Sequence, residues 1–229
     1  MHITADRETS IEEATNAAEE VIIYTDGSAI NGKVGAAAIL MRTNNLPCVL
    51  HKHLGSKKEH IVHKAELTGI LLAMQLISTE KHGSTLYAIT IDNQAAIQSF
   101  HSELRNPGHH LSREIIQIAN QIQKRRSKAK YTLVIHWTAG HEGIQGNETA
   151  DKEVKKAARG TSSDKPLLPH YLRKDLLINP AAVKRTHQDK LKSIWSKEWK
   201  ASERGKCTAK IDPSTPSKKF LNTLSELQG

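Results

Sequence analysis

Residues 136–151 read HWTAGHEGIQGNETAD and join two segments of different periodicity. The segment before the stretch, 131–136, alternates apolar and polar side chains and predicts a strand. The segment that ends it, 147–158, repeats small apolar residues at helical spacing and predicts a helix with Asp151 in its first turns. The glycine-rich middle of the stretch indicates a loop. This part of the chain is therefore predicted to be a strand, a loop and a helix that carries an acid.

The same alternation of strands and helices is predicted upstream. Apolar runs predict strands at 21–25, 33–41, 46–54 and 86–91. Apolar residues at helical spacing predict helices at 61–78, 94–100 and 111–122. The first three strands have short links and predict an antiparallel meander, and the later strands alternate with helices. The sequence therefore predicts an α/β domain with a mixed sheet.

Charge divides the chain into three predicted parts. Residues 1–20 carry a net charge of −5 and predict a flexible acidic leader, whereas 21–160 and 161–229 carry +7 each. We interpret 21–160 as the main domain and 161–229 as a linker followed by a basic helical extension. A basic protein body fits a polyanionic partner, although lysines that only solubilise the surface would give the same charge.

The composition also limits where the protein is expected to work. No apolar stretch approaches the ~20 residues of a membrane span, so a membrane partner is not expected. The two cysteines, Cys48 and Cys207, form no C-x-x-C pair, which favours a reduced, intracellular setting. Nothing in the composition distinguishes the nucleus from the cytoplasm.

The C-terminal extension is predicted to contain one long helix. Asn179 and Pro180 supply a cap and a first-turn proline. Five apolar residues and one histidine then form a stripe on one helix face: Val183, His187, Leu191, Ile194, Trp195 and Trp199. This face is interpreted as a packing or docking surface, with contact to nucleic acid as the alternative.

Four acidic residues in different local settings indicate the chemistry. Asp26 and Asp92 each end an apolar run, Glu66 lies near the start of a predicted helix, and Asp151 closes the glycine-rich stretch. An acid at the end of a buried strand is costly unless a charge neutralises it, and grouped acids repel unless a divalent cation lies among them. Helix-start acids also have a structural explanation in the helix dipole. Together the four favour a metal-dependent phosphodiester hydrolase.

These acids lie in motifs that resemble ribonuclease H. The motifs are TDGS (25–28), KAEL (64–67), IDN (91–93) and the long stretch 136–151, and their order agrees across residues 21–160. The last motif is the most specific. The resemblance implies a ribonuclease H-like fold: a five-stranded mixed sheet, three antiparallel strands and then parallel ones, flanked by helices and followed here by the helical C-terminal extension.

The resemblance implies an activity and a site. Asp26, Glu66, Asp92 and Asp151 would bind two Mg²⁺ ions, which Mn²⁺ would replace, and His141 would assist proton transfer or product release. The family cuts the RNA strand of RNA–DNA hybrids and leaves 5′-phosphate and 3′-hydroxyl ends. Candidate contacts to the RNA 2′-hydroxyls and backbone are Gly27, Ser28, Asn31, His63, Gln94 and Asn147.

Departures from the family pattern favour one branch of it. A basic, Trp-containing insertion after the third motif is missing. In this respect the sequence is closer to the ribonuclease H domains that are attached to reverse transcriptases. Residues 211–220 (IDPSTPSKKF) resemble the region after ribonuclease H in LINE-type (non-LTR) retrotransposon polyproteins. The expected partners are then an RNA–DNA hybrid and an adjacent reverse transcriptase domain. One alternative is an inactive or partner-dependent module that binds hybrids. Another is an integrase or exonuclease of the wider superfamily, but the glycine-rich loop at 140–148 argues against an integrase or exonuclease.

Overall fold

The structure is a computed structural model that describes residues 21–43, 45–81, 86–100, 108–126, 132–138 and 144–209. It divides into two compact units, Met1–Ala182 and Val183–Gly229. The predicted acidic leader and the resemblance at 211–220 lie outside the described residues.

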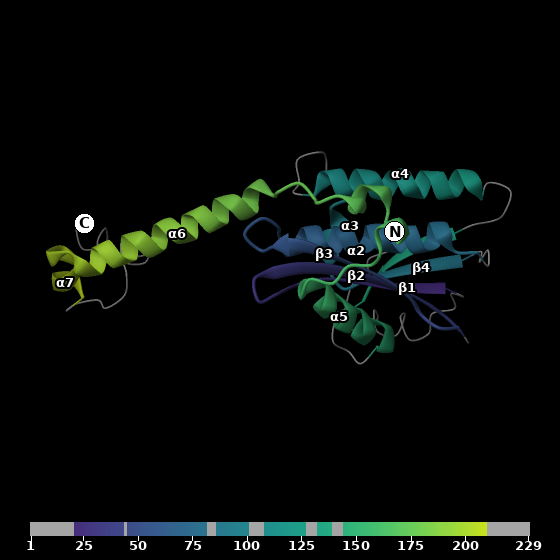
Figure 1. Ribbon diagram of the computed structural model, residues 1–229, viewed down its shortest axis with the longest axis horizontal. Coiled ribbons are helices and arrows are strands. Elements are labelled where there is room, and N and C mark those ends of the chain that lie inside the picture. Colours follow the sequence, from purple (N-terminus) through teal and green to yellow (C-terminus); the bar gives the residue numbers. More distant parts are fainter. Residues whose placement is uncertain are drawn as a thin grey trace, which may run out of the picture. The chain divides into compact units, whose positions relative to one another are not determined.

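The first unit contains a five-stranded mixed sheet in the order β3-β2-β1-β4-β5 (Figure 1). The strands are β1 (Val21–Ile30), β2 (Lys33–Arg42), β3 (Cys48–Ser56), β4 (Leu86–Ile91) and β5 (Thr132–Trp137). The pairs β1–β2 and β2–β3 are antiparallel, and the pairs β1–β4 and β4–β5 are parallel. This topology confirms the predicted mixed sheet, with three antiparallel strands followed by parallel ones.

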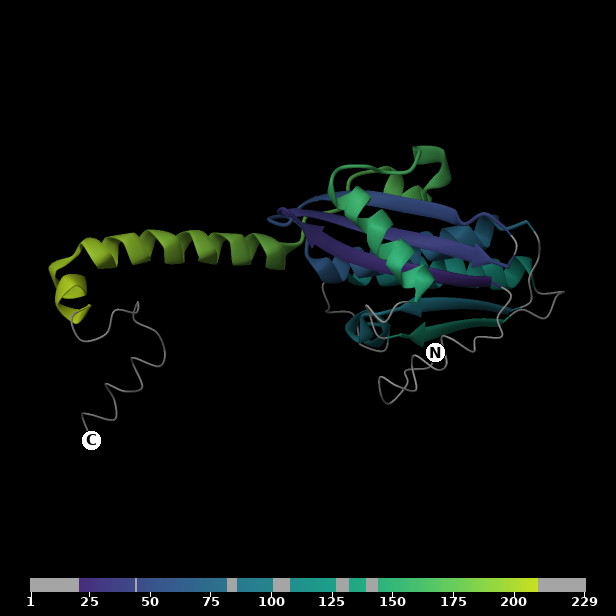
Figure 2. The ribbon, with the colours of Figure 1, turned by 90° about the horizontal axis from the view of Figure 1, so that it is seen from below.

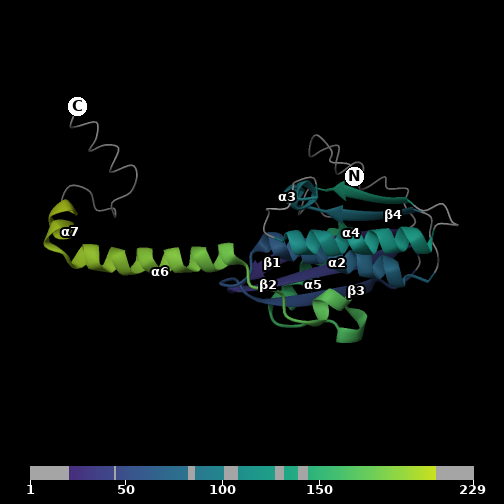
Figure 3. The same cartoon turned by 90° about the horizontal axis from the view of Figure 1, so that it is seen from above.

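Helices cover both faces of the sheet. They are α2 (Val62–Thr79), α3 (Gln94–Gln98), α4 (His109–Arg125) and α5 (Gln145–Ala158). Helix α2 packs on β1 and β2 with α4 beside it, as Figure 3 shows, and α5 crosses β1, β2 and β3 on the opposite face (Figure 2). The main core lies between the sheet and α2, where residues such as Ile23, Ile89 and Leu71 are fully buried.

Strand β1 is longer than its apolar run predicts. The strand was expected to end at Thr25, but it continues to Ile30 and pairs with β2 through Ile30 and Lys33. Asn31 and Gly32 form the turn with φ of 50° and 75°, which Asn and Gly adopt more readily than other residues. The polar residues after Thr25 remain in the strand because β2 supplies their backbone hydrogen bonds.

Residues 161–182 belong to the first compact unit. Two short 3₁₀ helices, η1 (Lys165–Leu167) and η2 (His170–Arg173), bring Leu168, Leu172 and Leu176 into the main hydrophobic core. The domain boundary after residue 160 stays a prediction, although the compact unit extends past it to Ala182.

A buried lysine attaches this segment to α2. Lys64 is fully buried, and its Nζ donates to the backbone carbonyl of Leu177 and lies 3.3 Å from Nδ1 of His60. Burial lowers the pKa of Lys64 to about 8. The Asn179 N–H also donates to the Glu59 carbonyl, 2.7 Å away, just before α2 begins.

The C-terminal extension contains α6 (Pro180–Ala201) and α7 (Glu203–Thr208). The predicted helix start is confirmed, because Oδ1 of Asn179 accepts a hydrogen bond from the Ala181 N–H at 2.9 Å. Among the described residues, no helix is both long and apolar enough to span a membrane.

Candidate active site

The parallel pairing of β1 and β4 places two acids side by side. The last paired residues are Thr25 and Ile91, and the next residue on each chain is an acid, Asp26 or Asp92. Because β4 ends there while β1 continues with β2, the two carboxylates lie where the parallel part of the sheet opens. The indole Nε1–H of Trp137, at the end of β5, donates to the Asp92 carbonyl at 3.0 Å and holds that backbone in place.

Close packing of α2 on β1 brings Glu66 to the same place. A Cβ at Gly27 would lie 2.3 Å from the Glu66 nitrogen and 2.5 Å from the Ala65 carbonyl carbon. No side chain fits there, so the glycine at position 27 permits the helix to approach the strand. Glu66 is the fifth residue of α2 and extends from the helix toward the strand ends.

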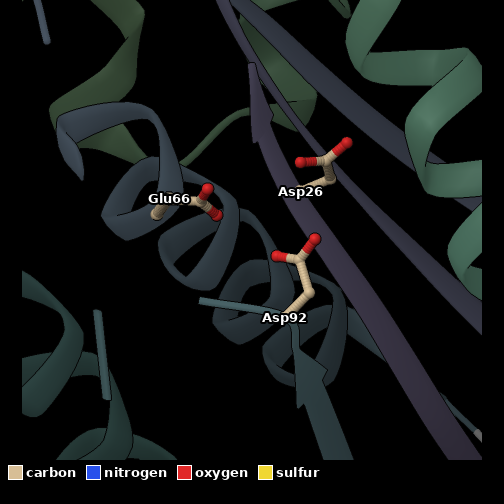
Figure 4. A group of neighbouring side chains, drawn as sticks. All are labelled: Asp26, Glu66 and Asp92. Atoms are coloured by element: carbon tan, nitrogen blue, oxygen red, sulfur yellow. The ribbon is translucent and has the colours of Figure 1, made fainter. Parts of the chain in front are cut away.

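Three carboxylates therefore converge (Figure 4). One carboxylate oxygen each from Asp26, Glu66 and Asp92 lies within 4.8 Å of the other two. Figure 4 shows them coming from β1, from α2 and from the end of β4. Like charges this close repel strongly unless a proton or a cation is shared among them.

Glu66 is the most constrained of the three. Its residue is only 4% exposed, and burial, followed by the charges of Asp92 and Asp26, raises the pKa of Glu66 well above its ordinary value. Two hydrogen bonds partly oppose this rise, one from Nδ2 of Asn93 to Oε1 of Glu66 at 3.4 Å and one from the Gly27 N–H. The other oxygen, Oε2, is buried without a hydrogen-bond partner among the described residues.

This donor set fits a divalent cation. Mg²⁺ prefers hard oxygen ligands and needs few carboxylates because it retains several waters. A cation here would neutralise the repulsion among the three carboxylates. It would also give the buried Oε2 of Glu66 a ligand contact.

The fourth acid, Asp151, lines a cleft together with Asp26 and Asp92. This cleft of about 110 Å³ is lined by Asp26 and Asp92 from the strand ends and by Asp151 from α5, together with Thr25, Ser28, Asn147 and Glu148. Gly146 lets α5 approach β1, because a Cβ there would meet the ring of Tyr24. Asp151 forms an ion pair with Lys155, one turn further along α5. The structure thus brings three acids together and places the fourth beside them, paired with a lysine.

Comparison with known proteins identifies the fold around this cleft. The sequence model described as RNase H matches residues 18–159. The chain belongs to the RNase H family. No match was found among curated proteins.

Solved structures similar to this RNase H domain are remote in sequence. The N-terminal RNase H domain of Rv2228c from Mycobacterium tuberculosis shares 16% identity, with a TM-score of 0.44, and the match covers 60% of this chain and 98% of that one. LC9-RNase H1, a type 1 RNase H with the type 2 active-site motif, shares 18% identity, with a TM-score of 0.48 and coverage of 63% and 75%. LC11-RNase H1, solved in complex with an RNA/DNA hybrid, shares 18% identity, with a TM-score of 0.45 and coverage of 61% and 96%.

The predicted substrate contacts fall into two groups in the RNase H domain. Ser28 and Asn147 line the cleft, and Nδ2 of Asn147 is buried with no hydrogen-bond partner among the described residues. Gly27 packs against the backbone of Glu66, and its N–H helps to lower the pKa of that carboxyl.

The remaining predicted contacts do not line this cleft. Asn31 lies in the β1–β2 turn, and Gln94 begins α3. His63 lies in the first turn of α2, where burial lowers its pKa. His141 lies outside the described residues. The contact assignments stay predictions.

Three residues that the structure places in or beside this cleft were given no role in the predictions from sequence. Asn93 accepts from the Ala96 N–H through Oδ1 at 3.2 Å while its Nδ2 donates to Glu66, so one side chain caps α3 and orients an acid. Thr25 and Glu148 line the cleft. An Asn directly before a helix is a capping signal and could have drawn attention to Asn93. The link from Asn93 to Glu66 depends on the packing of α2 against β4, which no local pattern shows.

Proposed function

We propose that this chain is an active, metal-dependent endonuclease that hydrolyses the RNA strand of RNA–DNA hybrids and leaves 5′-phosphate and 3′-hydroxyl ends. Membership of the RNase H family supports this proposal. The observation that carries it is the convergence of Asp26, Glu66 and Asp92, with a buried Glu66 oxygen that has no hydrogen-bond partner in the part of the chain that the structure describes. Without a bound cation, this repulsion is relieved only if one of the three carboxylates takes up a proton.

The residues of the site divide the work by position. Asp26, Glu66 and Asp92 would hold metal at the strand ends, and Asp151 would hold it from the α5 wall once Lys155 releases it. Two bound Mg²⁺ ions, or Mn²⁺ in their place, would activate the attacking water and stabilise the leaving 3′ oxygen. His141 is proposed to assist proton transfer or product release.

Recognition of RNA is proposed to depend on small polar groups at the cleft. Ser28 and Asn147 both line it, and a hydroxyl and an amide can each donate to or accept from a 2′-hydroxyl, which DNA lacks. These contacts reach the sugar and backbone rather than base edges. Cleavage is therefore expected to depend little on sequence.

We also infer a retroelement context. The missing basic insertion and the resemblance of residues 211–220 support descent from a LINE-type retrotransposon polyprotein. In that context an adjacent reverse transcriptase domain would be a partner that helps to hold the hybrid.

A panel of substrates tests the proposed activity. The full chain is incubated with end-labelled RNA–DNA hybrid, DNA duplex and RNA duplex, each with Mg²⁺ or with EDTA. We expect cuts in the RNA strand of the hybrid only, and only with metal. Equal cutting of the DNA duplex would contradict the proposal. Binding of hybrid without cutting in Mg²⁺ or Mn²⁺ would favour the inactive or partner-dependent module instead.

A further inference from the structure

Helix α6 carries a basic and aromatic face that the active site does not use. Lys184, Gln188, Lys192, Trp195 and Trp199 follow one another at intervals of three or four residues, so they lie along one side of the helix. We call this row the 184–199 face. The helix's two acids, Asp189 and Glu198, are not in the row.

The face is open to solvent. Lys184, Gln188 and Lys192 are exposed, Trp195 is 45% exposed and Trp199 is partly exposed. Neither lysine forms an ion pair with any residue in the described ranges. The cationic groups are therefore available to an outside anion.

The two tryptophans stack on each other beside these cations. Their ring centroids are 5.8 Å apart, and the ring planes differ by only 20°. A tryptophan ring offers a π-face on which a nucleobase can stack, and such stacking is indifferent to which base it meets.

We propose that the 184–199 face binds single-stranded nucleic acid, with Lys184 and Lys192 on phosphates and the Trp195–Trp199 pair against unpaired bases. Two exposed cations followed by two aromatic rings, with no acid in the row itself, complement a strand that carries phosphates and bare bases. A duplex keeps its bases stacked inside and offers them no such contact.

This proposal goes beyond the proposed hydrolase activity. The 184–199 face belongs to the compact unit Val183–Gly229, whereas the carboxylate cluster belongs to Met1–Ala182. Binding can be measured in EDTA, where no metal-dependent cleavage occurs. Failure of one proposal is therefore distinguishable from failure of the other.

Fluorescence anisotropy of a labelled oligothymidylate, titrated with the full chain in EDTA at several salt concentrations, tests the proposal. Trp195→Ala with Trp199→Ala should weaken binding about tenfold or more, since stacking contributes ~1–3 kcal/mol per base. Lys184→Gln with Lys192→Gln should reduce the slope of log K against log salt by about 1.4, which is ~0.7 per phosphate contact.

The matched control removes the same charge from another side of α6. Lys190 and Lys197 are also exposed and lie outside the 184–199 row, so Lys190→Gln with Lys197→Gln should leave the slope unchanged. If both lysine double variants reduced the salt slope equally, binding would depend on net charge alone, and the proposal would be overturned. Unchanged binding in the tryptophan variant would also overturn the proposal. Heparin, a polyanion without bases, is a further control: the proposal fails if the tryptophan variant loses as much affinity for heparin as for oligothymidylate.

Discussion

At the scale of single residues, the site is built around a carboxylate that the fold does not fully satisfy. Glu66 is buried between two other acids, and one of its oxygens has no hydrogen-bond partner in the described part of the chain. Without metal, the ionised form of Glu66 is costly. The surrounding packing, including the contact at Gly27, fixes Glu66 there nonetheless.

Glu66→Gln should therefore stabilise the metal-free protein at neutral pH. The native pKa of Glu66 lies above its unfolded value of about 4.5, so the wild type loses stability as pH rises past that value, whereas glutamine does not ionise. We expect the free energy of unfolding of the variant to exceed that of the wild type by on the order of 1 kcal/mol near pH 7.5, and the two to be equal near pH 4. Urea unfolding in EDTA across this range measures the difference. A variant that is less stable at pH 7.5, or an offset equal at all pH values, would refute this account.

Lys155→Met should strengthen metal binding. Lys155 pairs with Asp151 on the cleft wall, so its removal frees that carboxylate for a cation. A partly exposed pair of this kind is worth ~0.2–1 kcal/mol, which corresponds to a half-saturating Mn²⁺ concentration that is lower by about 1.4- to fivefold. Calorimetric titration with Mn²⁺ measures it. Lys156→Met, which breaks the neighbouring pair with Glu153, is the control and should change nothing.

Residues differed in how far the sequence revealed them. Asp26 and Asp92 were recognisable because each follows an apolar run, and the structure places them on neighbouring strands. The ion pair of Asp151 with Lys155 joins residues one helical turn apart, and their spacing allowed it without requiring it. The hydrogen bond from Asn93 to Glu66 joins residues on different elements and depends on tertiary packing.

At the scale of elements, residues 161–182 complete the first compact unit. Their start, Thr161 to Pro166, has the composition of a linker, yet the hydroxyls of Ser162 and Ser163 accept hydrogen bonds from the backbone of β3 at 2.9 and 3.0 Å. The segment thereby covers part of the outer edge of the sheet, which would otherwise expose unpaired backbone groups. Polar composition could not reveal this, because serine serves equally in linkers and as a partner for an edge strand.

Two truncations test the importance of this segment. A chain that ends at Ala182 should unfold cooperatively, whereas one that ends at Gly160 should lose several kcal/mol or fail to fold. The shorter chain lacks the buried Leu168, Leu172 and Leu176, each worth ~1.5–3 kcal/mol of burial, and leaves Lys64 without its carbonyl partner. Thermal unfolding by circular dichroism compares the two. Equal melting temperatures would show that the segment is dispensable.

At the scale of the whole molecule, the order of elements was predictable and the topology followed from it. The short links between the first three strands predicted the antiparallel meander, and the helices before β4 and β5 allowed the parallel pairs. The extent of β1 was not predictable from hydrophobicity, because the polar residues after Thr25 are held in the strand by β2. The same pairing carries Asp26 to the cleft.

The proposed activity requires that the carboxylate cluster binds metal and thereby supports hydrolysis of RNA in hybrids. The most direct test measures single-turnover cleavage of a labelled RNA–DNA hybrid in Mg²⁺ by the wild type, by Asp92→Asn and by Asp164→Asn, an exposed acid outside the cleft. Circular dichroism verifies that all three are folded. We predict that Asp92→Asn lowers the rate at least about a thousandfold, on the scale of losing one charged catalytic ligand, while Asp164→Asn cleaves like the wild type. Cleavage by Asp92→Asn at the wild-type rate would contradict the account.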